Sequence, residues 1–96
     1  MPDTGKNIHV HVFVSGIVQG VYFRAHARDK ALSLGLNGWV KNTDDGRVEI
    51  EAEGPRDKIN DFILWCHKGP SGARVAGVDV TEGTPSGSFS GFRIIY

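Results

Sequence analysis

Glycine spacing and one arginine give the stretch from Val14 to Arg24 the clearest chemical character in this sequence. The stretch reads VSGIVQGVYFR and lies between an alternating apolar run and a helical pattern. Gly16 and Gly20 allow backbone conformations that other residues avoid, so consecutive N–H groups can turn inward and form a concave anion site. The following helix brings the positive end of its dipole, and Arg24 in its first turn brings a planar fork suited to phosphate. These residues predict a phosphate cradle made of main-chain amides and one arginine.

Taken alone, the glycine spacing has a simpler explanation. A Gly-x-x-x-Gly loop before a helix is more often a tight turn than an anion site. The loop also lacks the Gly-Lys-Ser/Thr ending of a P-loop and the third glycine of a dinucleotide fingerprint, so we assume no nucleotide. The choice between a turn and a cradle therefore depends on the rest of the chain.

The elements that position this loop follow from the hydrophobic pattern. Period-two alternation predicts strands at 8–15, 36–42, 47–53 and 75–82, with a short final strand at 92–96. Helical spacing predicts a helix at 22–34 that Gly35 stops, and a second helix with Pro55 at its first position and Gly69 at its close. Asp45 and Gly46 predict a hairpin turn at 43–46.

This order of elements predicts an α+β fold. It is that of a ferredoxin-like β-α-β-β-α-β sandwich, with an antiparallel sheet, two helices on one face and a short extra C-terminal strand. Residues 1–7 are expected to form a flexible leader, and residues 8–96 a single domain. Such a fold serves enzymes, RNA binders and regulatory modules alike, so the architecture leaves the function open.

Histidines and glutamates on the predicted strands raise two further possibilities. His9 and His11 have a spacing that could serve a metal, and Glu49, Glu51 and Glu53 form a row of carboxylates. Side chains on the exposed face of a strand are more often solvated or paired across strands. We therefore expect histidine–glutamate pairs on a face that meets water, and no metal site.

Composition narrows the classes of partner. The chain has 96 residues, and its 11 basic and 11 acidic side chains cancel, which argues against a nucleic-acid or membrane surface. No apolar run is long enough for a membrane span, and the N-terminus has no signal-peptide pattern. Cys66 is the only cysteine, so it forms no internal disulfide and is expected in the core; its isolation favours a reducing cytoplasm. The zero net charge and the lack of an obvious apolar patch suit a monomer.

Two long motifs resemble the acylphosphatase family. The sequence VSGIVQGVYFR at 14–24 resembles the first motif of that family, and GWVKN at 38–42, followed by Gly46, Val48 and Gly54, resembles the second. The segments 69–75 and 87–92 are also similar. The resemblance covers nearly the whole chain from about Val10, and two long motifs in the right order are far more specific than a glycine loop.

The resemblance implies that the protein hydrolyses acyl phosphates to a carboxylate and inorganic phosphate, with no metal or organic cofactor. It implies that Arg24 binds the phosphoryl oxygens together with the loop amides, and that Asn42 orients the attacking water. Without the motif, Asn42 would be interpreted as a turn-capping residue. Tyr22 lies where the family pattern varies and is expected to tune the pocket. The residues expected to bind the substrate are Gly16, Gln19, Gly20, Val21, Tyr22 and Phe23.

Two other functional classes remain open at this point. An RNA-binding module would need exposed aromatic and basic residues on the open sheet face, where the sequence offers Phe13 but mainly histidines and glutamates. A non-catalytic anion-sensing domain would keep the loop without turnover, and only an assay distinguishes it from a hydrolase.

Overall fold

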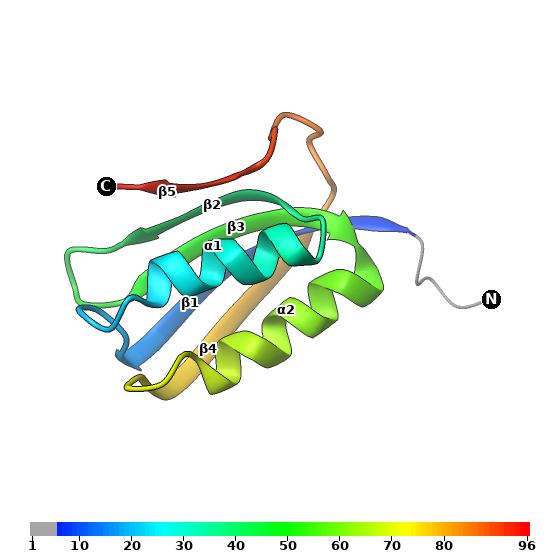
Figure 1. Cartoon of the computed structure of the whole chain (residues 1–96). Coiled ribbons are helices and arrows are strands. Elements are labelled where there is room, and N and C mark those ends of the chain that lie inside the picture. Colours follow the sequence, from blue (N-terminus) through cyan, green and yellow to red (C-terminus); the bar gives the residue numbers. More distant parts are fainter. Residues whose placement is uncertain (1–5) are drawn as a thin grey trace.

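The computed structural model describes residues 6–96 and contains five strands and two helices (Figure 1). In chain order these are β1 (Asn7–Ile17), α1 (Phe23–Ser33), β2 (Asn37–Asn42), β3 (Val48–Pro55), α2 (Arg56–Lys68), β4 (Arg74–Gly83) and β5 (Phe92–Ile95). Most of the predicted leader, residues 1–5, lies outside the described residues, and Asn7 already belongs to β1. No helix in the described part of the chain is long and apolar enough to cross a membrane.

The strands form one sheet in the order β4-β1-β3-β2-β5, and both helices cover the same face of it (Figure 1). β3 pairs antiparallel with β1 on one side and with β2 on the other, so β1 and β2 run in the same direction. This is the ferredoxin-like arrangement that the order of elements predicts. The sheet is mixed rather than wholly antiparallel, because the added strand β5 pairs parallel with β2.

The core lies between the sheet and the helices. Alternate residues of β1 and β3 point into it, as the period-two pattern predicts, and each fully buried aliphatic side chain contributes about 1.5–3 kcal/mol. The sheet side supplies Val10, Val12, Val14, Val40, Val48 and Ile50, and the helix side supplies Phe23, Ala27, Ala31, Ile59, Phe62 and Cys66. Burial raises the pKa of the Cys66 thiol to about 12, so Cys66 is a core residue as predicted and not a nucleophile.

Two helix starts differ slightly from the prediction. α1 begins at Phe23 because Tyr22 adopts a left-handed conformation, with φ 59°, that a right-handed helix cannot contain. α2 begins at Arg56, so the prediction that Pro55 is its first residue is wrong by one position. Pro55 has ψ 140° and still pairs with Asn7, because the fixed φ of proline suits an extended strand as well as a helix.

The open face of the sheet carries the cross-strand pairs that the sequence predicts. His9 lies 3.0 Å from Glu51 and 2.7 Å from Glu53, and His11 lies 2.6 Å from Glu49. The described residues include no group of histidine, cysteine and carboxylate side chains arranged to hold a metal ion. Because the histidines lie on β1 and the glutamates on β3, the histidine–glutamate pairs hold these two strands together.

Glu53 pairs with His9 as predicted but does not meet water as expected, since only 6% of its surface is exposed. Its oxygens accept hydrogen bonds from the N–H of Ser86 at 2.8 Å, the hydroxyl of Ser86 at 2.9 Å, the N–H of Gly87 at 3.0 Å and the ring of His9. Burial by itself raises the pKa of Glu53, but these bonds outweigh it and lower the pKa from 4.5 to about 2. Glu53 thereby fastens the segment between β4 and β5 to the sheet.

We expect Glu53→Gln to destabilise the protein by about 1–3 kcal/mol at neutral pH, because an amide cannot accept all of these bonds. The pKa of this carboxyl is lower in the folded state than in the unfolded state. The extra free energy of unfolding that the Glu53 carboxylate gives the wild type is therefore fully present above pH 4.5. It shrinks as the pH falls toward about 2. Urea unfolding across this range measures both effects.

The matched control is Asp61→Asn on the exposed surface of α2, for which we expect no such loss. A difference between the wild type and Glu53→Gln that stayed constant from neutral to acid pH would contradict the assigned role of the Glu53 charge.

Candidate active site

The loop that joins β1 to α1 starts from an irregularity at the end of β1. The register with β4 shifts between Ser15 and Gly16, and Gly16 has φ 122°. A Cβ atom at Gly16 would lie only 2.1 Å from the carbonyl oxygen of Arg74. Glycine is therefore required here because the backbones of β1 and β4 approach closely, and the bulge turns the chain toward the helix side.

The backbone of residues 18–22 offers unused hydrogen-bond donors. None of their N–H groups donates to a backbone or side-chain acceptor within residues 6–96. Gly20 has φ 76° and Tyr22 φ 59°, and these left-handed conformations bend the loop. The loop leads directly into α1, whose first N–H groups also lack intrahelical acceptors. The first turn of α1 contains no acidic residue, so nothing within it offsets the positive end of the helix dipole.

Gln19 anchors this loop to the hairpin between β2 and β3. Its side-chain Nε2 donates to the carbonyl oxygens of Thr43 and Arg47, at 2.9 Å each. The N–H of Thr43 also donates to the carbonyl oxygen of Arg47 at 2.8 Å, which closes the hairpin. The loop is therefore held in a fixed position relative to the end of β2.

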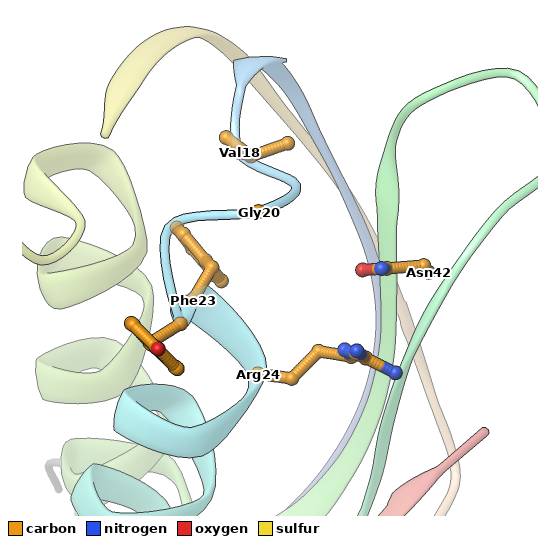
Figure 2. A pocket seen from close by; sticks show the side chains of 6 residues that line it. Val18, Gly20, Phe23, Arg24 and Asn42 are labelled. Atoms are coloured by element: carbon orange, nitrogen blue, oxygen red, sulfur yellow. The ribbon is translucent and has the colours of Figure 1, made fainter. Parts of the chain in front are cut away.

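Arg24 is the second residue of α1, and its side chain extends toward β2 (Figure 2). Within the described chain its guanidinium has no carboxylate partner, but its Cζ lies 4.9 Å from the centre of the Tyr96 ring. A cation held by an aromatic ring keeps its N–H donors available for an anion.

Asn42 is the last residue of β2 and lies on the same side of the sheet as the buried Val40, which is the helix side. Figure 2 shows the side chains of Asn42 and Arg24 pointing toward each other from β2 and α1. The Asn42 Oδ1 atom is buried and has no hydrogen-bond partner in the described part of the chain, residues 6–96. An unpaired buried amide oxygen costs about 1–3 kcal/mol, which is unusual for a residue with a purely structural role.

These features meet in a pocket of about 280 Å³. It is lined by Val18, Gly20, Tyr22, Phe23, Arg24 and Asn42. Five of these residues are candidates from the sequence. Val18 was missed; the only sequence signal for it is that it lies within the motif at 14–24. The lining includes no carboxylate, histidine or cysteine. The pocket can therefore bind an anion and hold a polar molecule beside it, but it has no carboxylate, histidine or thiol to act as an acid or base.

The other candidate residues support the loop without lining the pocket. Gly16 contacts the β4 backbone, Gln19 binds the hairpin, and Val21 packs against the hydrophobic core. Sequence spacing places all of them in one motif but does not separate residues that face a ligand from those that shape the loop.

Comparison with known proteins shows to which protein family this chain is related. Residues 10–94 match the model of the family described as Acylphosphatase. The chain belongs to the acylphosphatase family. It is 52% identical over 86 residues to an acylphosphatase of Roseiflexus sp. (strain RS-1), covering 90% of this chain and 92% of the relative. It is 53% identical over 87 residues to that of Syntrophus aciditrophicus (strain SB), covering 91% of each.

Solved structures agree with the sequence comparison. The crystal structure of acylphosphatase from Bacillus subtilis superposes with a TM-score of 0.90 at 39% identity, covering 93% of this chain and 99% of that one. The acylphosphatase structure from Coxiella burnetii gives a TM-score of 0.88 at 44% identity, covering 99% and 100%. The predicted family and fold class are confirmed, and this acylphosphatase-family chain is an enzyme.

We expect Gln19→Ala to weaken the binding of inorganic phosphate by about tenfold, because losing two hydrogen bonds frees the loop that supplies the amide donors. Titration calorimetry measures the affinity for phosphate. In the comparison variant Gln19→Glu, an acceptor faces the two carbonyl oxygens, so phosphate binding should weaken at least as much. An unchanged phosphate affinity in Gln19→Ala would mean that the loop keeps its shape without this anchor.

Proposed function

We propose that this enzyme hydrolyses the carboxyl–phosphate bond of acyl phosphates to a carboxylate and inorganic phosphate. One observation carries the proposal: the buried Asn42 oxygen has no partner among residues 6–96, and Asn42 lines the same pocket as Arg24 and the loop. The acylphosphatases among its relatives support the same reaction.

The phosphoryl group would bind where positive charge and free donors converge. The loop amides, the N-terminus of α1 and the guanidinium of Arg24 all favour an anion at this position. Phosphoryl transfer is helped chiefly by positioning and by stabilising charge on the phosphoryl oxygens. Arg24 and the loop therefore provide the main electrostatic assistance in the proposed reaction.

Asn42 would hold the attacking water. Its carboxamide oxygen accepts a hydrogen bond from the water, and the amide does not titrate near neutral pH. In the proposed step the water oxygen forms a bond to phosphorus while the bond from phosphorus to the acyl oxygen breaks. The electron pair leaves with the carboxylate, and the proton of the water passes to a phosphoryl oxygen.

The identity of the leaving group explains why the pocket needs no acid. A carboxylate is a stable anion and departs without being protonated, unlike an alkoxide. A pocket lining without a carboxylate, histidine or cysteine therefore suits an acyl phosphate better than a phosphate ester of an alcohol.

An RNA-binding module and a non-catalytic anion sensor, the two other functional classes, fit the molecule less well. The open face of the sheet carries Glu49, Glu51 and the pairs with His9 and His11, and carboxylates on this face disfavour an RNA backbone. An anion sensor would explain the loop amides and Arg24 but gives the unpaired Asn42 oxygen no role. Turnover in the assays below distinguishes the hydrolase from the sensor.

Replacing Arg24 by alanine is expected to lower kcat/KM for acetyl phosphate by at least about 10²-fold, because the largest source of positive charge at the phosphoryl oxygens is removed. Phosphate release in the presence of a chelator measures the effect and also tests the expected independence from metals.

Arg28→Ala serves as the matched control, since Arg28 lies one helical turn further along α1 and pairs with the exposed Asp29 at 3.2 Å. This control should keep the wild-type rate. Wild-type turnover in Arg24→Ala would contradict the proposed role of Arg24, and loss of wild-type activity on chelation would contradict metal independence.

For Asn42→Ala we expect kcat to fall about 10²-fold while the inhibition constant of inorganic phosphate changes little, because the variant loses the orientation of the water rather than the anion site. Steady-state kinetics with phosphate as inhibitor separates the two effects. Asn60→Ala, on the exposed surface of α2, is the control. Equal losses in phosphate binding and in kcat would show that Asn42 acts on the anion and not on the water.

A further inference from the structure

A second cavity adjoins the phosphate pocket and has a different character. It has a volume of about 210 Å³ and is lined by Tyr22, Arg24, Ala25, Ile94 and Tyr96. Tyr22 and Arg24 line both cavities, so the two cavities meet at these side chains. The second lining consists of two aromatic rings and two aliphatic side chains, with Arg24 as its one charged member. Such a surface suits an apolar group that is attached to an anion in the first cavity.

Tyr22 shows two features that folding does not explain. It is the one non-glycine residue within 6–96 with a positive φ, and a left-handed conformation costs such a residue about 1–2 kcal/mol. Its surface is also 80% exposed, so the ring contributes little to the core. A strained backbone that presents an exposed aromatic ring is typical of a position kept for ligand contact.

Tyr96 provides the opposing ring. It follows β5, which runs parallel to β2, so it lies at the same end of the sheet as Asn42. Tyr96 is 94% exposed, and its ring lies over the guanidinium of Arg24. Ile94 also lines the cavity, and because it packs against the hydrophobic core it gives the cavity a fixed apolar surface.

We propose that this second cavity receives the acyl group of the substrate, and that Tyr22 favours aromatic acyl groups over small ones. The inference rests on the proposed hydrolysis of acyl phosphates. With the phosphoryl group between Arg24 and Asn42, the bridging oxygen connects it to an acyl group that lies beside Tyr22. An aromatic acyl group stacks on this ring, whereas an acetyl group is too small to contact it fully.

The test compares benzoyl phosphate with acetyl phosphate. Tyr22→Gly removes the ring and suits the left-handed backbone, and Tyr22→Phe keeps the ring. The ratio of kcat/KM for benzoyl phosphate to kcat/KM for acetyl phosphate should fall about tenfold in Tyr22→Gly and stay near the wild-type value in Tyr22→Phe. The chemistry of each leaving group is the same in every variant, so a change in this ratio reports the acyl contact.

The outcomes separate this inference from the proposed function. An unchanged ratio in Tyr22→Gly overturns the acyl cavity while acyl-phosphate hydrolysis stands. No phosphate release from either substrate by the wild type overturns the proposed function itself. Should Tyr22→Gly fail to fold, Tyr96→Ala carries the test, because removal of the opposing ring should lower the same ratio and an unchanged ratio there is equally decisive against the proposal.

Discussion

The position of β3 between β1 and β2 is the constraint on which the rest of the structure depends. Because β3 pairs antiparallel with both strands, their C-terminal ends lie at the same end of the sheet. The loop after β1 and Asn42 at the end of β2 therefore meet, although they are distant in the sequence. The buried alternation of these strands holds the register, and a slip of one residue would turn Asn42 to the open face.

Polar groups at the two ends of the sheet differ in whether they have hydrogen-bond partners. At one end Glu53 is buried with hydrogen bonds from Ser86, Gly87 and His9, and its pKa is lowered to about 2. At the other end the loop amides and the Asn42 oxygen have no hydrogen-bond partners among residues 6–96. An unpaired buried oxygen costs about 1–3 kcal/mol, so the satisfied Glu53 indicates a structural role and the unsatisfied Asn42 indicates a ligand.

Rigid supports surround these unsatisfied groups. The bulge at Gly16 fixes where the loop leaves β1, and Gln19 ties it to the hairpin that follows Asn42. The ring of Tyr96, just after β5, lies against the guanidinium of Arg24. Donors and acceptors that are fixed before a ligand binds need little reorganisation, which is what electrostatic stabilisation of a phosphoryl group requires.

By itself, the sequence determined which residues face the core and which elements form, because side-chain periodicity records burial directly. It also supplied the loop motif, Arg24 and Asn42 through their resemblance to a family. The sequence pattern could not show that the segment at 84–91 covers Glu53, that Pro55 ends a strand, or that Gly16 serves the contact with β4. Only the tertiary structure decided these points and joined Tyr22 to Tyr96 in one cavity, because they depend on contacts between segments far apart in the chain.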